Sequence, residues 1–281
     1  QVLSTYAHPL ADLVYAYPDK RLHPVFSQTG TATGRLSSSK PNAQNLPAHS
    51  DIGKAILAAF RTDETWLVSA DFSQIELRVL AHYAGGKLLH AYTRGIDVHQ
   101  QTADLVGITR QQAKTLNFAS IYGAGPARVA DMLSISKDEA QRFLDGYWEA
   151  YPGVRKLRAD VLRAARSRGY IRTLAGRHGR FPDYMHTLPG GRSADQFRTE
   201  RQIFNLLIQG GAADIVKSGM LRCKEAGLAI VSQIHDDVII ETGDPQRDAE
   251  RLRECLEGAW PQLRVPLVAE PAVGKSFAEL K

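Results

Sequence analysis

The sequence predicts an α+β fold in which an antiparallel sheet covered by helices is interrupted by a helical insertion. Short apolar strand patterns lie toward both ends of the chain, at 65–70, 228–240 and 266–270. Helical patterns fill the middle of the chain, from about residue 74 to residue 168. Strands that are grouped apart from helices are typical of α+β domains, whereas α/β folds alternate the two. We therefore expect one sheet that is assembled from both ends of the chain.

The first 80 or so residues combine irregular structure with one buried strand. Residues 1–20 indicate a helix end and a loop, and residues 23–47 are rich in Thr, Ser, Gly, Pro and Asn, which indicates short strands and turns. The apolar run 65–70 predicts a strand that leads into Asp71. From Gln74 onward the apolar residues recur at helical spacing, so a helix is expected directly after this strand.

The rest of the chain is predicted to be mainly helical. Further helices are expected at 98–106, 110–122, 127–133, 137–151, 154–167, 194–226 and 248–259. Ser136 is a typical N-cap because two acids follow in the first turn. A hairpin is expected over 170–182, and the β-branched runs 228–231 and 238–240 predict a second hairpin.

The composition is that of an ordinary globular protein. The chain has 281 residues, of which 43% are hydrophobic and 23% are charged. Its two cysteines, Cys223 and Cys255, lie far apart, which argues against a disulfide framework and favours an intracellular compartment. No apolar run approaches the 18 or so residues of a membrane span, so we expect no membrane partner.

The basic charge is concentrated in one segment. The net charge of the whole chain is +5, which favours a polyanionic partner. Between residues 153 and 181 there is one acid, Asp160. The same segment holds nine basic side chains: Arg155, Lys156, Arg158, Arg163, Arg166, Arg168, Arg172, Arg177 and Arg180. A solvated helix face is the alternative explanation, but such a face does not require the near absence of acids.

Carboxylates stand at the ends of two predicted strands. Asp71 follows the strand 65–70, and Asp236 and Asp237 lie in the tight end of the second hairpin. Each of them is compatible with a simple turn or strand-end role. Together they are also compatible with a site for two Mg²⁺ ions about 4 Å apart, because oxygen ligands suit Mg²⁺ and such sites serve phosphoryl transfer.

The predicted helix 110–122 carries an ordered polar and aromatic stripe. Arg110, Lys114, Phe118 and Tyr122 recur every four residues and therefore share one face. Two cations four residues apart repel each other, so an anion such as a triphosphate would compensate them. A base could stack on the aromatic end. Taken singly, the two aromatic residues would more often belong to a core.

Two further segments have the composition of ligand contacts. Arg201, Asn205 and Gln209 recur every four residues on an otherwise apolar helix, and amides of this kind can contact the minor groove of a nucleic acid. A helix with one wet face explains the pattern equally well. Arg35 lies in the loop 28–47, where its neighbouring glycines would allow a close approach to a phosphate or a base edge.

These segments, in this order, resemble the A-family DNA polymerases over nearly the whole chain. Asp71-Phe-Ser-Gln-Ile-Glu-Leu-Arg78 is similar to the first catalytic motif of that family. The helix from Arg110 to Gly123 is similar to its fingers motif, Arg-x3-Lys-x3-Phe/Tyr-x3-Tyr-Gly. Gln233-Ile-His-Asp-Asp237 is similar to its last motif, which usually ends in His-Asp-Glu.

The resemblance implies a right-hand polymerase palm with a helical fingers insertion. It implies that Asp71 and Asp236 bind two Mg²⁺ ions, for which Mn²⁺ could substitute, and that Asp237 is a weaker ligand. Primer-template DNA and dNTPs are the implied partners. The implied organisation is a segment leading from a missing thumb (1–20), palm (21–84), fingers (85–197) and palm again (198–281).

The resemblance also assigns the nucleotide contacts. It implies that Arg110 and Lys114 hold the triphosphate and that Lys114 is an acid for the leaving pyrophosphate. Phe118 would stack at the nucleotide, in a form that discriminates against dideoxynucleotides, and Tyr122 would lie where the templating base enters. Glu76 would block a 2′-OH, which selects deoxynucleotides. Gln74 is also expected at the nucleotide.

The DNA contacts complete the implied site. They are expected at Thr33, Arg35, Asn42, Gln44, Asn45, Arg201, Asn205, Gln209 and His235. The basic segment 153–181 would hold the template strand or the duplex backbone, with a steep dependence on salt. The implied location is the cytoplasm or nucleoid of a bacterium or a phage-infected cell, with an organelle as the alternative.

Three departures from the family pattern stand out. Asp237 occupies the position where the family usually has Glu, and its side chain is one methylene shorter. The stretch from Glu76 to Arg110 is shorter than in the bacterial repair enzymes, which predicts a trimmed fingers subdomain. The chain also begins after the place where a thumb and a 3′–5′ exonuclease domain would lie, so a missing domain or a processivity partner is expected.

Two other functions stay open at this point. A polymerase fragment that binds DNA but is inactive without its thumb would retain the same motifs. A single-subunit RNA polymerase shares the architecture, but Glu76 argues against that function because it would exclude a ribose 2′-OH.

Overall fold

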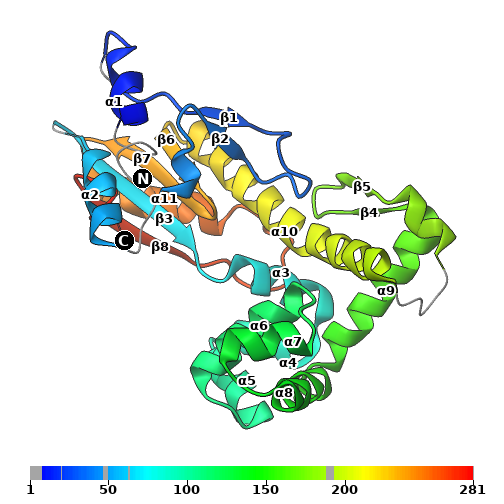
Figure 1. Cartoon of the computed structure of the whole chain (residues 1–281). Helices are drawn as coiled ribbons and strands as arrows, with labels where there is room; N and C mark the ends of the chain where they lie inside the picture. The colour runs from blue at the N-terminus through cyan, green and yellow to red at the C-terminus, as the bar shows by residue number, and fades with distance from the viewer. Residues whose placement is uncertain (1–7, 20, 47–49, 63, 188–192, 281) are drawn as a thin grey trace. The chain divides into compact units, whose positions relative to one another are not determined.

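The structure is a computed structural model that describes residues 8–19, 21–46, 50–62, 64–187 and 193–280. Pro47, the end of the predicted N-terminal loop, lies outside these residues. The chain forms two compact units, each continuous in space but not in sequence (Figure 1). The first, here called the sheet unit, comprises Gln1–Ser73, Ile215–Pro261 and Leu267–Lys281. The second, the helical unit, comprises Gln74–Asp214 and Gln262–Pro266.

The sheet unit is built on a four-stranded antiparallel sheet with the order β6-β7-β3-β8. Its strands are β3 (Trp66–Phe72), β6 (Ala229–Ile234), β7 (Asp237–Thr242) and β8 (Ala269–Gly274). The chain therefore assembles one sheet from both ends, as the sequence predicted. The predicted strand 266–270 is wrong in position, because Pro266 to Val268 precede β8 and Pro271 lies within it. A proline is tolerated there because β8 is an edge strand.

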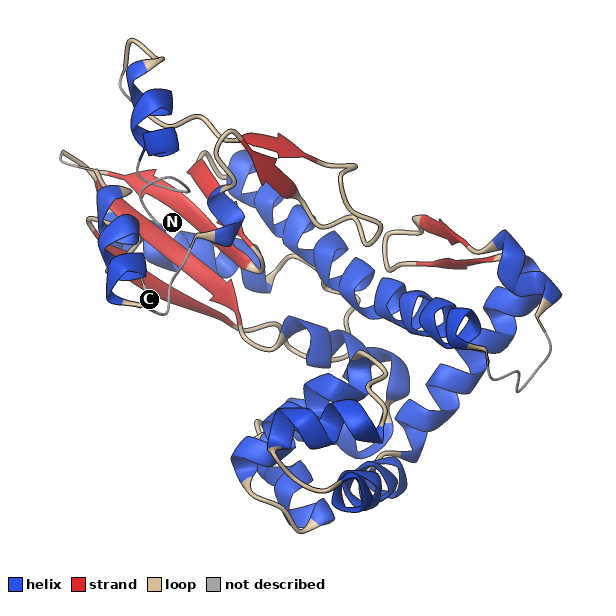
Figure 2. Ribbon diagram, viewed as in Figure 1, coloured by secondary structure: helices blue, strands red, loops and turns tan. Residues whose placement is uncertain are grey.

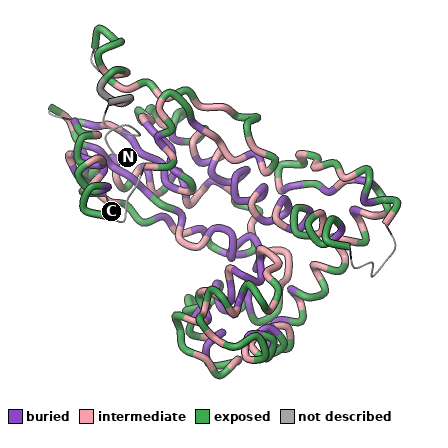
Figure 3. Tube along the Cα trace, viewed as in Figure 1, coloured by how far each residue is buried: buried purple, intermediate pink, exposed green. Residues whose placement is uncertain are grey.

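Strand alternation gives the sheet two different faces. Cross-strand partners point to the same face, and Leu67 pairs with Glu241 while Ser69 pairs with Ile239. Leu67 and Ile239 join Leu57 and Phe277 in an apolar cluster that covers part of this face. The two central strands, β3 and β7, are mainly buried (Figure 3). The end of this face nearest Asp71 carries polar side chains instead.

The opposite face packs against helix α11 (Pro245–Glu257) and the end of helix α10 (Ala194–Glu225). A Cβ atom added at Gly219 of α10 would lie 2.7 Å from Leu256 and 3.6 Å from Phe72, so the glycine permits this close packing. The predicted helix 248–259 is confirmed but begins earlier, with Asp244 as its N-cap and Pro245 in the first turn.

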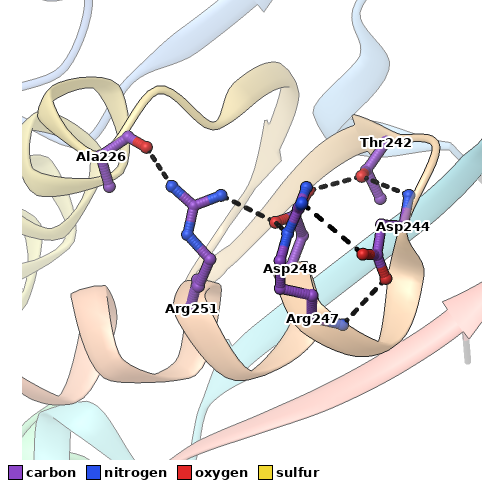
Figure 4. A network of polar contacts seen from close by, with 6 residues as sticks. All are labelled: Ala226, Thr242, Asp244, Arg247, Asp248 and Arg251. Atoms are coloured by element: carbon purple, nitrogen blue, oxygen red, sulfur yellow. Dashed lines mark hydrogen bonds and ion pairs between the residues drawn. The ribbon is translucent and has the colours of Figure 1, made fainter.

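A polar network fastens the start of α11 to the sheet (Figure 4). Asp248 accepts hydrogen bonds from Thr242 at 2.5 Å and from Arg251 at 2.8 Å. Arg247 donates to both carboxylate oxygens of Asp248, and Arg251 also donates to the carbonyl oxygen of Ala226. These bonds, with that of Arg247 first, hold the pKa of Asp248 well below its ordinary value. The network thus joins β7, α11 and the residue that directly follows α10.

Smaller elements complete the sheet unit. Strands β1 (Val25–Ser27) and β2 (Ser37–Ser39) form a separate antiparallel pair, and the short helix η2 (Ala43–Asn45) follows it. Helix α1 spans His8–Tyr15. Helix α2 (Asp51–Ala59) was not predicted, although Ser50 caps it through the backbone of Gly53. Its nine residues offer too short an apolar pattern to be distinguished from loop.

The helical unit consists of helices apart from the short β4–β5 pair (Figure 2). Its elements are α3 (Ile75–Ala84), α4 (Gly86–Thr93), α5 (Val98–Val106), α6 (Arg110–Ile121), α7 (Pro126–Leu133), α8 (Lys137–Ala150), α9 (Pro152–Arg168), β4 (Tyr170–Arg172), β5 (His178–Arg180), η3 (Pro182–His186) and the first part of α10. All predicted helices in this region are confirmed, whereas α4 was missed because Gly85 and Gly86 stand at its start and its pattern is short. Thr109 and Ser136 form capping boxes at α6 and α8.

The helix ends explain why the predicted boundaries hold. Asp97 caps α5, and Gly107 at φ 76° ends it in the left-handed conformation that glycine adopts readily. Gly169 ends α9 in the same way. No helix in the described ranges is both long enough and apolar enough to cross a membrane.

Candidate active site

The register of the sheet brings acidic side chains together at one end of it. Asp71 on β3 lies directly opposite Asp237 on β7 and Glu270 on β8. The three side chains therefore project from the same face of three adjacent strands. Asp237 is buried, whereas Asp71 and Glu270 are exposed. Sequence reasoning missed Glu270, because nothing in its local pattern indicates which strand it will face.

Asp236 reaches the same end of the sheet through a tight turn. His235 and Asp236 are the two central residues of the hairpin between β6 and β7, which closes with the pair Ile234 and Asp237. His235 has a φ of 57°, and two-residue hairpin turns favour a positive φ at this position. The carbonyl oxygen of Asp236 accepts a hydrogen bond from the backbone of Phe72 at 3.2 Å, so the turn is held against the end of β3.

The charge of Asp236 is balanced by an arginine from the β1–β2 loop. Arg35 lies 3.4 Å from its carboxylate, and the Asp236 side chain is 23% exposed. Burial raises the pKa of Asp236, while the nearby Arg35 and His235 oppose that rise. A cation at this carboxylate is therefore favourable, and Arg35 supplies one in this structure.

The donor set fits a hard divalent cation. Carboxylate oxygens are the ligands that Mg²⁺ prefers, and Mg²⁺ sites commonly use one or two protein carboxylates together with water and substrate phosphates. Within the described ranges no group of three or more His, Cys, Asp or Glu side chains could hold a metal ion by itself. Asp71 and Asp236 supply oxygen ligands of the kind that Mg²⁺ prefers.

Two of the loop candidates for DNA contact, Arg35 and Gln44, contact the same hairpin. Gln44 donates to the side chain of Gln233 at 2.8 Å, which ties η2 to β6. Asn42 caps η2 by accepting from the backbone of Gln44, so its side-chain oxygen serves the local fold. Thr33 is half-buried, and Asn45 is exposed. These residues and Arg35 belong to the same unit as the acids.

The helical unit presents the predicted stripe on α6. Arg110 and Lys114 are exposed and Phe118 and Tyr122 are half-buried, whereas the intervening Ala113, Leu116, Asn117, Ala119, Ser120 and Ile121 are buried. The stripe is therefore accessible on a helix whose opposite side is buried, and Gln111, Gln112 and Thr115 widen the accessible side. This arrangement agrees with the predicted ligand face.

The first cation of the stripe has a carboxylate partner. Arg110 Nε donates to Asp97 Oδ2 at 2.8 Å. Asp97 Oδ1 accepts from the backbone of His99 and Gln100. Although burial alone raises the pKa of Asp97, the bond from Arg110 and the two backbone bonds lower it.

His99, a buried residue of α5, lies beside Phe118 of this stripe, and sequence reasoning missed it. The Asn117 side chain lies within hydrogen-bond distance of Thr102, at 3.1 Å, and of His99 Nδ1, at 2.9 Å, so it holds the imidazole in place. Burial lowers the pKa of His99; Asp97 opposes this shift, and Arg110 and Lys114 add to it. Its ring lies 6.1 Å from that of Phe118. The motif Asp97-Val-His99 at a helix start was the available signal.

The Glu76 and Gln74 side chains are fixed by tyrosines. Tyr122 donates to the buried carboxylate of Glu76 at 2.6 Å, which joins the start of α3 to the end of α6. Tyr92 donates to the side-chain oxygen of Gln74 at 2.8 Å. Gln74 adopts a φ of 54° as the N-cap of α3. Both candidates are therefore held in defined orientations.

The stripe on α10 has the expected pattern. Arg201 is exposed and Asn205 and Gln209 are half-buried, while their neighbours on the helix from 203 to 210 are buried. The side-chain oxygen of Asn205 is buried and has no hydrogen-bond partner among the described residues. A buried acceptor of this kind is costly unless a ligand satisfies it.

The basic segment is only partly a surface. Arg155, Lys156, Arg163, Arg168, Arg172 and Arg180 are exposed. Arg166 instead donates to Tyr184, Arg177 pairs with Asp214 at 3.3 Å, and Arg158 lies over the ring of Phe204. Three of the nine basic residues thus hold the helical unit together. The prediction that the whole segment faces a polyanion is too broad.

A hollow of about 700 Å³ lies beside the end of α6, within the helical unit. Its lining includes the loop 123–126, Trp148, Arg155, Arg158 and Phe197. Aromatic rings and arginines together suit the bases and phosphates of a single strand.

The candidate residues divide between the two units. Thr33, Arg35, Asn42, Gln44, Asn45, Asp71, His235, Asp236 and Asp237 lie in the sheet unit. Gln74, Glu76, Arg110, Lys114, Phe118, Tyr122, Arg201, Asn205 and Gln209 lie in the helical unit. The acids and the DNA-loop candidates thus come together in one unit, and the nucleotide candidates come together in the other.

Comparison with known proteins gives a consistent result. The profile of DNA polymerase family A matches residues 1–279. The thermostable DNA polymerase I of Thermus thermophilus is 41% identical and that of Thermus aquaticus 40% identical, each over 99% of this chain and 35% of the relative. DNA polymerase I of Bacillus caldotenax is 38% identical over 99% of this chain and 33% of its own length.

A solved structure shares the fold. The POL domain of Pol1 from M. smegmatis, in complex with a DNA primer-template and dNTP, superposes with a TM-score of 0.86 and 33% identity. The match covers 97% of this chain and 50% of that one. The fold is thus a polymerase palm, an antiparallel sheet with helices, interrupted by a helical fingers insertion. The chain spans about a third of the length of the curated relatives that it matches. The matching profile, the relatives and the shared fold show that the chain belongs to DNA polymerase family A.

Proposed function

We propose that this chain is a template-directed DNA polymerase that adds deoxynucleotides to a primer 3′-OH and releases pyrophosphate. The observation that carries the proposal is the register that places Asp71 opposite Asp237, next to the turn that holds Asp236. The solved relative, which is a complex with primer-template and dNTP, supports DNA and nucleotide as partners.

The proposed reaction is a nucleotidyl transfer. The primer 3′-oxygen bonds to the α-phosphorus of the dNTP, the bond from that phosphorus to the pyrophosphate oxygen breaks, and the proton of the 3′-OH passes to solvent water. Asp71 and Asp236 would hold two Mg²⁺ ions, or Mn²⁺ in their place, and Asp237 is a weaker candidate. When bound, such ions lower the pKa of the attacking hydroxyl and neutralise the charge of the leaving group.

The helical unit would bind the nucleotide. Arg110 and Lys114 provide exposed cations for the triphosphate, and Lys114 would donate a proton to the leaving pyrophosphate. Phe118 would stack on the nucleotide, and Tyr122 would lie at the templating base. Glu76 would leave no room for a 2′-OH, because its carboxylate is buried and held by Tyr122. Gln74 would contact the same nucleotide.

The remaining candidates would hold DNA. The proposed contacts are Thr33, Arg35, Asn42, Gln44, Asn45, Arg201, Asn205, Gln209 and His235. The partnerless oxygen of Asn205 supports a ligand at α10. The exposed arginines of α9 and the β4–β5 pair would contact phosphates, and the hollow beside α6 would take the unpaired template.

The functional subdomains are part of the proposal. We assign 21–84 and 198–281 to the palm and 85–197 to the fingers, with 1–20 as the connection from a thumb. Three further points stay predictions: a thumb or exonuclease domain outside these residues, a processivity partner, and an intracellular location in a bacterium or phage-infected cell.

Primer extension with Mg²⁺ tests the proposed function. The wild-type chain should extend a primer with dNTPs and not with rNTPs, and Asp71→Ala should abolish extension while Glu254→Ala, an exposed acid on α11, should not. DNA binding without any extension at low salt would favour the binding-fragment alternative. Extension with rNTPs would favour an RNA polymerase.

A further inference from the structure

We propose that Asp97 is a positioning residue that fixes the guanidinium of Arg110 for a triphosphate ligand. The inference rests on the proposed function, because it concerns how the helical unit would receive the nucleotide. The printed bonds of Asp97 go to Arg110, His99 and Gln100, so it would act on the ligand only through Arg110.

Both oxygens of the Asp97 carboxylate are used. Oδ1 accepts from the backbone N–H groups of His99 at 2.9 Å and Gln100 at 3.1 Å, and these bonds cap α5. Oδ2 accepts from Arg110 Nε at 2.8 Å. The carboxylate is therefore fixed by the backbone of one helix while it holds the first side chain of another.

The geometry of the bond determines which part of Arg110 is available. A guanidinium is planar, so a bond to Nε restricts the rotation of the whole fork. Among the described residues no partner is found for its two terminal nitrogens. The outer edge, which suits two oxygens of a phosphate, is thus oriented but unoccupied by protein.

The position of the pair agrees with this role. The Arg110 side chain is 52% exposed, so without a tether it would sample many rotamers. Lys114 lies one turn further along the same face, and His99 follows Asp97 by two residues. A fixed Arg110 would therefore reduce the entropy that is lost when a triphosphate binds.

Removal of the Asp97 charge distinguishes positioning of Arg110 from a direct electrostatic effect of the carboxylate on the bound anion. A carboxylate beside an anion site repels the anion, so its neutralisation alone should tighten anion binding. If Asp97 positions Arg110, the same change should weaken binding. The two explanations predict opposite signs.

Asp97→Asn is the test variant. Asn is as good an N-cap as Asp, so α5 should stay capped. With its oxygen on the cap, the Asn amide would present a donor to Arg110 Nε and the bond would be lost. Asp244→Asn is the matched control, because Asp244 also caps a helix, α11, and pairs with an arginine, Arg247, at 3.6 Å.

Tripolyphosphate binding, followed by NMR titration without Mg²⁺, measures the effect apart from catalysis. Asp97→Asn should weaken binding about fivefold, and Asp244→Asn should leave it unchanged. In an Arg110→Lys background, which lacks the planar fork, Asp97→Asn should no longer weaken binding. In primer extension, Asp97→Asn should raise KM for dNTP about fivefold and change kcat less.

The outcomes distinguish the two proposals. Unchanged or tighter tripolyphosphate binding in Asp97→Asn, or no binding by the wild type, would overturn the positioning role. A wild-type chain that shows the Asp97 effect on binding but never extends a primer would support the positioning role and refute the polymerase activity. Equal melting temperatures of the two variants exclude loss of fold as the cause.

Discussion

The two units hold their candidate functional residues by different means. In the sheet unit, the positions of Asp71 and Asp237 follow from backbone register, because the two residues are direct cross-strand partners. In the helical unit, Arg110 and Glu76 depend on side-chain partners, Asp97 and Tyr122. The position of a carboxylate that is set by strand register changes only if the strand pairing changes. The orientation of a side chain that is held by another side chain is lost when that partner is substituted. In the sheet unit, substitutions should therefore affect activity mainly by removing the carboxylate itself. In the helical unit, substitutions of the partner side chains should also affect activity, because they change the orientation of Arg110 and Glu76.

The largest expected loss of activity distinguishes two neighbouring residues of the β6–β7 hairpin, Asp236 and Asp237. Asp236→Asn should lower kcat at least about 1,000-fold, because it removes a proposed metal ligand without changing the turn. Asp237→Asn should cost about tenfold, since Asp237 is the weaker candidate. Single-turnover primer extension measures both effects. An Asp237 variant that is as damaged as the Asp236 variant would reverse the assignment.

Lys114→Ala tests the chemical contribution of the helical unit. Loss of the proposed acid should lower the turnover number about 100-fold and change DNA affinity little. Rapid-quench kinetics and a DNA-binding titration would be compared with those of Lys137→Ala, an exposed lysine at the start of α8. Unchanged turnover would remove Lys114 from the chemistry.

Asp248→Asn should break the sheet unit rather than the reaction. The variant would lose charge-assisted bonds to Arg247 and Arg251, at a cost of about 2 kcal/mol in the free energy of unfolding. Because the pKa of Asp248 is lowered by folding, the wild-type advantage should be complete above the unfolded pKa and decline as pH falls toward the folded pKa. Urea unfolding at neutral and acidic pH measures it. Glu254→Gln, at an exposed acid of the same helix, should show neither effect.

The smallest expected effect concerns sugar selection. Glu76→Ala should raise the use of rNTP relative to dNTP about tenfold or more, because the side chain that would meet the 2′-OH is gone. Competitive incorporation measures the ratio. Tyr122→Phe removes only the hydrogen bond to Glu76 and should give a smaller change of the same sign. An unaltered ratio in Glu76→Ala would exclude it as the selecting residue.

Much of this arrangement was predictable, because local patterns carry local information. The stripe on α6 follows from helical spacing, and the carboxylates of Asp71 and Asp236 follow from the ends of apolar runs. Contacts between distant segments do not follow from such patterns. Glu270 faces Asp71 only because β8 pairs with β3 in one register, and that register also displaced the predicted last strand. Asp97 binds Arg110 only because the start of α5 packs beside the start of α6.

Charge patterns were predictable in sign but not in exposure. The basic segment is real, yet Arg158, Arg166 and Arg177 make contacts inside the helical unit. Their partners are Tyr184, Phe204 and Asp214, which lie in other elements of the helical unit. A one-dimensional count of arginines therefore overestimates the surface that is available to DNA.

Both edges of the sheet carry a feature that discourages self-association. Pro271 lies in the edge strand β8, and the pairing of the other edge strand, β6, shifts between Ile230 and Ser232. A proline offers no backbone donor to an incoming strand, and an irregular edge presents a poor template for one. The purified chain should therefore resist the edge-to-edge aggregation to which open sheets are prone, even at the high concentrations that the NMR titration requires.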